Sequence, residues 1–327
     1  MTIDYLVTGA TGLVGNNLVR VLLEKQCTVR ILARETSSRR PLQGLDVEWV
    51  IGDVTDKDAV QRAVTGVNCV LHAAADTHIG WRGLNRQRLI NVQGTTFVAH
   101  AALTQGIRVV QISSVDALPI AKSPQEVIDE EATGEPKSKC TYVVTKRQSE
   151  AEVFRLLDKG LDAVIVNPGF MLGPWDWKPS SGRMLLSIAK HPSPVAPTGG
   201  MSGCDVRDVA TAIVSAAERG VRGRRYILAG ENITYLDAWQ RMARQVGARP
   251  PRWRMGPLVR IIAGYGGDLW GYVSGGEPEV NSALIEMSQQ FHYYDSSRAK
   301  RELDYQTRSF DASIRDAWEW FKREHYV

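Results

Sequence analysis

Thr8-Gly9-Ala10-Thr11-Gly12-Leu13-Val14-Gly15 is the stretch of sequence that decides the fold. The apolar run Tyr5-Leu6-Val7 precedes it and an amphipathic segment over 16–25 follows it, so the order is strand, glycine turn, helix. Gly9 permits the tight turn, Gly12 lets a phosphate approach the backbone, and Gly15 lets the helix pack close to the strand. Because a helix N-terminus offers free N–H groups and a partial positive charge, this stretch predicts a diphosphate site.

Apolar strands alternate with helical patterns through the first half of the chain. The pattern predicts strands over 5–7, 29–33, 47–51, 69–73, 108–113 and 163–167, and helices over 16–25, 57–65, 84–105 and 142–159. This alternation implies parallel βαβ units in a doubly wound α/β sheet. Such sheets bind ligands at the carboxyl ends of their strands, which here carry Gly9, Arg34, Asp53, Ala74, Ser114 and Pro168.

The pattern loosens after Pro168. Residues 174–203 are rich in Pro, Gly, Ser and Trp and suit a loop-heavy region. Helices are expected over 205–218, 234–245 and 311–324, and a strand over 226–228 returns to the sheet. We therefore expect a nucleotide-binding domain from residues 1–168 and about 204–230, and a smaller C-terminal α/β substrate-binding region from 169–203 and 231–327.

Composition excludes several classes of protein. The 327 residues carry a net charge of only +4, with acids and bases interspersed, so no nucleic-acid footprint stands out. The four cysteines lie far apart, without the C-x-x-C pairs of zinc or redox sites. No apolar run approaches the roughly 20 residues that span a bilayer, and the chain opens directly into a core strand. These features predict a soluble, cytoplasmic protein with reduced thiols, no metal site and no integral membrane segment.

A second motif carries the chemistry. Tyr142 and Lys146 are four residues apart, so on a helix they share a face, and Ser114 ends the fifth expected strand. A free tyrosine has a pKa near 10, and a nearby ammonium favours the phenolate and lowers that pKa. Tyr142 would then give a proton to a carbonyl oxygen or take one from an alcohol, while Ser114 hydrogen-bonds the same oxygen.

The glycine turn, Ser114 and Tyr142-x-x-x-Lys146 together resemble the extended short-chain dehydrogenase/reductase family, also called the NAD-dependent epimerase/dehydratase family. The resemblance covers nearly the whole chain and implies a Rossmann fold and an NAD(P)-dependent enzyme. It assigns catalysis to Ser114, Tyr142 and Lys146, with Ser114 favoured over Ser113, and it also places Lys146 on the nicotinamide ribose.

The same resemblance implies a set of cofactor contacts. Asp53 matches the position that binds the adenine amino group, and Asn91 matches a helix asparagine that is often structural. The expected cofactor-binding residues are Gly9, Thr11, Gly12, Leu13, Val14, Gly15, Arg34, Asp53, Val54, Ala73, Ala74, Ala75, Lys146, Pro168 and Gly169. Members that prefer NAD have an acid after the second strand, whereas this chain has Arg34, whose guanidinium suits a 2′-phosphate. We therefore favour NADP, with NAD as the alternative and adenine stacking as the other role for Arg34.

The reaction is less determined than the cofactor. Residues 166–174 lack the arginine and tyrosine of many sugar-nucleotide enzymes and resemble dihydroflavonol-4-reductase-like, 3β-hydroxysteroid dehydrogenase-like and hopanoid-associated sugar epimerase-like proteins. Expected substrate-binding residues are His78, Trp81, Phe170, Met171, Trp175 and Trp177, a lining that suits a bulky, mostly apolar small molecule. For the Trp pair, core packing is the competing interpretation.

A ketone reductase or alcohol dehydrogenase is the leading hypothesis. A sugar-nucleotide epimerase is the alternative, as is a dehydratase, for which Asp116 is a candidate acid at an unusual position. A non-catalytic NAD(P) sensor is a third class. Residues 257–273 are apolar but interrupted by Arg260, Asp268 and glycines, so they cannot span a membrane. They predict an ordinary helix and loop, with a flap against the site or a surface resting on lipid as alternatives. Both a homodimer and a monomer remain open.

Overall fold

A parallel sheet forms the centre of the computed structural model, which describes residues 3–134, 138–278 and 280–327. Within these ranges the largest sheet has seven strands, all paired in parallel, in the order β10-β6-β5-β4-β1-β2-β3. The strands are β1 (Ile3–Thr8), β2 (Val29–Ala33), β3 (Glu48–Ile51), β4 (Val67–His72), β5 (Arg108–Ile112), β6 (Ala163–Pro168) and β10 (Arg225–Leu228). The order reverses between β1 and β4, which places a ligand crevice beyond their carboxyl ends. This is the Rossmann arrangement, and it confirms the predicted fold class.

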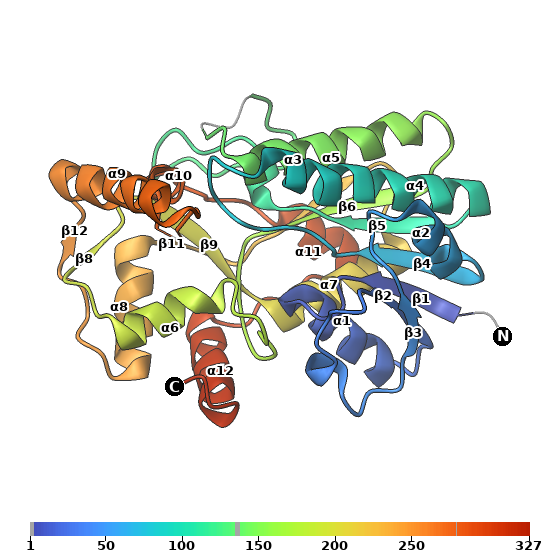
Figure 1. Ribbon diagram of the computed structural model, residues 1–327, viewed down its shortest axis with the longest axis horizontal. Helices are drawn as coiled ribbons and strands as arrows, with labels where there is room; N and C mark the ends of the chain where they lie inside the picture. Colours follow the sequence, from blue (N-terminus) through green and yellow to red (C-terminus); the bar gives the residue numbers. More distant parts are fainter. Residues whose placement is uncertain (1–2, 135–137, 279) are drawn as a thin grey trace.

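Helices cover both faces of the sheet (Figure 1). The helices α1 (Leu13–Glu24), α7 (Val206–Arg219) and α11 (Ser297–Leu303) pack on one face, and α2 (Lys57–Val64), α4 (Gly94–Gln105) and α5 (Thr141–Leu157) on the other. Successive strand residues alternate between two buried cores: Val7 and Leu71 enter one, and Leu6 and Val70 enter the other. Burial on both faces explains why the strands read as nearly continuous apolar runs.

The single helix expected over 84–105 is interrupted. It consists of α3 (Leu84–Gln87), a π-helical turn (Arg88–Gln93) and α4. The wide turn contains Asn91, whose side chain is buried and accepts a hydrogen bond from the Asp76 N–H at 2.7 Å. We attribute the interruption to this inward contact, because π-helical turns within helices often position a functional or structural side chain.

A second group of elements lies beside the main sheet, on the left in Figure 1. Its strands are β7 (Phe170–Leu172), β9 (Gly200–Asp205) and β11 (Glu231–Thr234) in one small sheet, and β8 (Val195–Ala196) and β12 (Trp253–Arg254) in another. Its helices are α6 (Gly182–Lys190), α8 (Tyr235–Val246), α9 (Pro257–Ser274), α10 (Ser282–Met287) and α12 (Phe310–Arg323). The region over 174–203, expected to be rich in loops, therefore contains the helix α6 and the short strand β8. The glycine-rich strand β9 also begins within it, at Gly200.

Candidate functional site

The glycine turn joins β1 to α1 as expected. Gly9 has a φ of +69°, and a Cβ there would lie 2.7 Å from the Ala73 carbonyl carbon. A Cβ on Gly15 would lie 2.2 Å from the Gly9 carbonyl oxygen. Gly12 differs from both, because the nearest atom to its Cβ position is 3.4 Å away. Gly9 and Gly15 are therefore required by the protein's own packing, whereas the space over Gly12 is open to a ligand.

The N-terminus of α1 has the features of an anion-binding site. Among the described residues, no side chain caps this helix at Gly12, and its first turn holds no acid. The first backbone N–H groups of the helix are thus left for a ligand, and the helix dipole favours a negative one. This open cradle fits the diphosphate of a dinucleotide.

The other expected cofactor residues follow the neighbouring strands. Arg34 is exposed after β2, with Ala33 buried before it. Asp53 follows β3, and its Oδ1 accepts hydrogen bonds from the N–H and Oγ1 of Thr55, both at 2.9 Å. The remaining expected residues occupy the turn and α1 (Thr11, Leu13, Val14), the loops after β3 and β4 (Val54, Ala73, Ala74, Ala75) and the end of β6 (Pro168, Gly169). All lie at the carboxyl edge of the sheet, and their contacts with a dinucleotide stay predictions.

His72, which the sequence analysis did not single out, links the end of β1 to α4 at this edge. One ring nitrogen lies 2.7 Å from Thr8 Oγ1 and the other 3.1 Å from Thr95 Oγ1. Burial lowers the pKa of His72 to about 3, with a smaller contribution from Lys146, so the ring is neutral. Thr8 in turn accepts from the Ala74 N–H at 3.2 Å. A buried strand-end histidine gives no sequence signal that separates it from an ordinary core residue.

The structure brings Ser114, Tyr142 and Lys146 together. Ser114 follows β5, while Tyr142 and Lys146 lie in the first turns of α5, and all three side chains are buried. Lys146 Nζ donates to the Ile112 carbonyl oxygen at 3.1 Å and lies 5.9 Å from the centre of the Tyr142 ring. The end of β5 therefore fixes both the serine and the ammonium beside the phenol.

The charges around Tyr142 differ from the expectation. Burial raises the pKa of the phenol, and the Asp116 carboxylate raises it further, while hydrogen bonding with Ser114 opposes these effects. Burial lowers the pKa of Lys146 to about 8, against the opposing charges of Glu150 and Asp116. In this structure the pKa of Tyr142 therefore lies above its ordinary value rather than below it, because burial and the Asp116 carboxylate both favour the protonated phenol.

Asp116 and His292 extend the site. Ser114 Oγ donates to Asp116 Oδ2 at 2.9 Å, and Asp116 Oδ1 lies 3.3 Å from His292 Nδ1. His292 Nε2 lies 3.1 Å from the Met287 carbonyl oxygen. Burial favours the neutral form of Asp116, yet hydrogen bonds and charge from His292 and Ser114 bring its pKa below the usual value. His292 comes from a segment far along the chain with no recognisable motif, so only the fold reveals it.

Two asparagines tie together the elements that carry Ser114, Tyr142 and Lys146. Asn167 donates to the Ser114 carbonyl oxygen at 2.8 Å and to Glu150 Oε1 at 2.7 Å, which joins the end of β6 to the loop after β5 and to α5. Asn91 donates to the Asp76 carbonyl oxygen and to Thr145 Oγ1, each at 3.0 Å. Asn91 is thus bonded to the protein itself, in the structural role that the resemblance implies for this asparagine.

The expected substrate residues after β4 lie against α10. His78 Nε2 lies 3.1 Å from Glu277 Oε2, and the Trp81 N–H donates to Glu277 Oε1 at 2.7 Å. The Trp81 indole donates to Ser282 Oγ at 2.7 Å. On the other side of this loop, Ile79 joins an apolar cluster of Cys140, Tyr142, Val143, Ala283 and Met287. Apolar side chains of α10 therefore belong to the same buried cluster as Tyr142.

The remaining expected substrate residues lie on and after β7. Phe170 and Met171 are half-buried in that strand. The rings of Trp175 and Trp177 lie 6.2 Å and 5.1 Å from the ring of Trp320 on α12. The Trp175 ring is also covered by the Arg20 guanidinium of α1 at 3.4 Å. The structure gives the Trp pair a packing role, and substrate contact by any of these residues stays a prediction.

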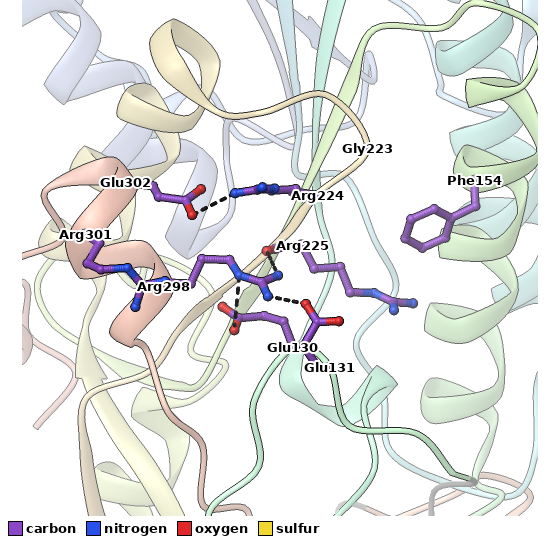
Figure 2. A pocket seen from close by; sticks show the side chains of 9 residues that line it. All are labelled: Glu130, Glu131, Phe154, Gly223, Arg224, Arg225, Arg298, Arg301 and Glu302. Carbon is purple, nitrogen blue, oxygen red and sulfur yellow. Dashed lines mark hydrogen bonds and ion pairs between the residues drawn. The ribbon is translucent and has the colours of Figure 1, made fainter.

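A hollow of about 460 Å³ elsewhere on the molecule is distinct from this site (Figure 2). Arg224 pairs with Glu302 at 2.8 Å, and Arg298 bridges Glu130 and Glu131. Glu130 Oε1 also accepts from the Ile227 N–H of the edge strand β10 at 2.9 Å. These pairs fasten α11 to the sheet edge, which is a structural role. The lining comprises Glu130, Glu131, Phe154, Gly223, Arg224, Arg225, Arg298, Arg301 and Glu302.

Comparison with known proteins agrees with this geometry. Residues 5–229 match the NAD dependent epimerase/dehydratase family. Sterol demethylase protein B of Methylococcus capsulatus is 36% identical, over 98% of this chain and 99% of its own. A Synechocystis protein provisionally named dihydroflavonol 4-reductase is 33% identical, over 99% of this chain and 96% of its own. The crystal structure of gox2253 is 34% identical, with a TM-score of 0.85 and 98% of each chain covered. The chain therefore belongs to the NAD-dependent epimerase/dehydratase family and is an NAD(P)-dependent enzyme of the extended short-chain dehydrogenase/reductase type.

Proposed function

We propose that this enzyme reduces a ketone, or oxidises the corresponding secondary alcohol, on a bulky and largely apolar small molecule. The observation that carries the proposal is the setting of Tyr142. Ser114 hydrogen-bonds with the phenol, and Ile79, Ala283 and Met287 belong to the same apolar cluster as Tyr142. A buried phenol with a raised pKa is protonated at neutral pH, so it is ready to donate to a carbonyl oxygen.

The residues of the site then have separate roles. Tyr142 donates the proton to the carbonyl oxygen, or receives it from the alcohol, and Ser114 hydrogen-bonds the same oxygen. Lys146, held at the end of β5, would hold the ribose beside the nicotinamide, and its positive charge would stabilise the phenolate as it forms. Asp116 is a positioning residue that orients Ser114, and His292 holds Asp116. A nicotinamide dinucleotide on the glycine turn would supply or accept the hydride.

NADP is the cofactor that we propose. Arg34 is exposed at the end of β2, where a carboxylate would bind the two ribose hydroxyls of NAD. A charged hydrogen bond to a 2′-phosphate is worth roughly 10- to 100-fold in affinity. Arg34→Ala should lower NADPH affinity by that factor and leave NADH affinity nearly unchanged, whereas the control Arg62→Ala on α2 should change neither. An unaltered NADPH affinity in Arg34→Ala would leave NAD as the cofactor to expect.

The apolar substrate class is supported by similarity as well as by the site. The relative with 36% identity carries a name that concerns sterols. We therefore propose a screen of NADPH oxidation across ketones of flavonoid, steroid and long-chain type. Tyr142→Phe should reduce turnover by about 100- to 10,000-fold, while Tyr5→Phe, remote on the first strand, should retain it. Full turnover in Tyr142→Phe would remove the catalytic assignment.

The epimerase alternative predicts a different result in the same screen. Such an enzyme would purify with tightly bound NAD and would convert a sugar nucleotide without net consumption of NADPH. A non-catalytic sensor would bind the cofactor and turn over no substrate.

A further inference from the structure

The helix α9 packs against the rest of the molecule with its small and polar side. Gly264 and Gly271 are buried and Gly267 between them is half-buried, and a Cβ on Gly267 would lie 2.0 Å from the Val280 carbonyl oxygen. The only charged residues of the helix face the same way: Arg260 donates to Gln289, and Asp268 accepts from the Ser282 N–H at 3.0 Å. The usual polarity of a surface helix, with its apolar side turned toward the core, is therefore inverted.

The opposite side of α9 presents large apolar side chains to the outside. Leu258, Ile262, Tyr265 and Leu269 follow one another at intervals of four, three and four residues, so they share one face. Their side chains are 63–69% exposed. Five more exposed residues widen this stripe: Val259, Ile261, Trp270, Tyr272 and Val273. Figure 1 shows α9 at one extreme of the molecule, beyond α10 and far from the seven-stranded sheet. A continuous apolar face of this kind marks an interaction surface.

Two further observations identify what covers this face. Trp253 on β12 lies just before α9, is exposed, and is flanked by exposed Arg252 and Arg254. The described part of α9 and β12 exposes no acid, so the face is apolar with a basic edge. Trp and Tyr make up much of it, and both residues favour the interface between lipid and water.

We propose that α9 and β12 form a docking surface for the anionic face of a lipid bilayer. The helix would lie in the plane of the interface with its apolar face among the acyl chains and the arginines at the phosphates. Among the residues that the structure describes, no helix has the length and apolar composition to cross a membrane. A second copy of the chain is the poorer partner, because a symmetric interface would bring the same basic edges together without acids to pair with them.

The docking surface leads to the active site. α10 follows α9 along the chain, and its Ala283 and Met287 belong to the same buried apolar cluster as Tyr142. Between the two helices, Glu277 accepts from the backbone N–H groups of Trp81 and Arg82, at 2.7 and 3.1 Å. An apolar molecule leaving the bilayer at α9 would thus be one helix away from the catalytic phenol. The docking proposal itself stands on α9 and β12, whichever reaction the enzyme performs.

Flotation of the full chain with vesicles tests the proposal. Wild type should float with phosphatidylcholine vesicles that contain phosphatidylglycerol, and more weakly with phosphatidylcholine alone. Ile262→Gln with Leu269→Gln should lower the partition coefficient by about 100-fold, because each buried apolar side chain contributes roughly 10-fold. The matched control is Leu89→Gln with Val221→Gln, two exposed apolar residues elsewhere, which should bind as wild type does.

A second pair of variants tests the basic edge. Arg252→Ala with Arg254→Ala should weaken binding to the anionic vesicles by on the order of 10-fold and leave binding to phosphatidylcholine unchanged, and Arg62→Ala should have no effect. Circular dichroism melting reports that each variant folds. Wild type that stays in the aqueous phase with both vesicles would overturn the proposal. So would dimers in solution that the α9 variants dissociate, because a second copy would then cover the face.

Discussion

We predict that the buried charge of Lys146 lowers the free energy of unfolding, although the reaction needs this lysine. The variant Lys146→Met tests this prediction directly. The ammonium is buried on α5, and burial lowers its pKa from 10.5 to about 8. Holding this charge at pH 7 therefore costs about 3 kcal/mol relative to a solvated lysine. The hydrogen bond from Nζ to the Ile112 carbonyl returns about 1 kcal/mol. Methionine has a similar shape without the charge, so we expect a net gain of about 2 kcal/mol.

The destabilisation by the Lys146 charge depends on pH in a defined direction. The folded-state pKa lies below the unfolded one, so the charged form is disfavoured by folding. The cost is fully present below about pH 8 and is lost as the pH rises from about 8 toward 10.5. The stability difference between Lys146→Met and wild type should therefore be largest at pH 7 and shrink by pH 9.5.

Urea unfolding at several pH values measures this difference, and turnover is followed in parallel. Lys146→Met should be more stable than wild type at pH 7 and nearly inactive. The control Lys159→Met, an exposed lysine near the end of α5, should stay within about 0.5 kcal/mol of wild type at every pH. Two results would contradict the prediction: a Lys146→Met variant less stable than wild type at pH 7, or a gain in stability that does not change with pH. Either result would show that the buried charge of Lys146 does not destabilise the folded protein.

Three further outcomes follow from the geometry. Gly12→Ala should fold normally but bind NADPH at least about 10-fold more weakly in calorimetry, whereas Gly15→Ala should lose about 3 kcal/mol of stability because its Cβ meets the Gly9 carbonyl. A loss of stability in Gly12→Ala with normal NADPH binding would contradict the proposal that Gly12 leaves space for the cofactor. His292→Leu should move the acid limb of the kcat profile to higher pH, since His292 holds down the pKa of Asp116; an unmoved limb would show that Asp116 does not act on the reaction. Glu277→Ala should raise KM several-fold with little change in kcat, because its hydrogen bonds fix the loop after β4; a pure kcat loss would argue against this positioning role.

The sequence predicted the main sheet closely because each buried strand is a short apolar run. The range 29–33 coincides with β2, and the other predicted strands differ from the structure by one or two residues at their ends. The close grouping of Ser114, Tyr142 and Lys146 follows from the same topology, since β5 and α5 meet at the carboxyl edge.

Features that depend on distant partners could not be predicted. β9 contains Gly200 and Gly203 and has little strand signal of its own; its partners β7 and β11 lie on either side of it in the sequence. The region over 257–273, for which a helix and loop was the first expectation, is the continuous helix α9, and its glycines at 264 and 267 fit closely against the chain around α10. The raised pKa of Tyr142 depends on burial and on Asp116, neither of which spacing reveals.

The central claim is net hydride transfer with Tyr142 as the proton donor. Its most direct test is the stoichiometry of NADPH consumed to alcohol formed, measured with purified wild type and the best ketone from the screen. We predict one NADPH oxidised for each alcohol formed, with both rates falling together in Tyr142→Phe. Product formed without net NADPH oxidation, by an enzyme that purifies with bound NAD, would contradict the claim and identify an epimerase instead.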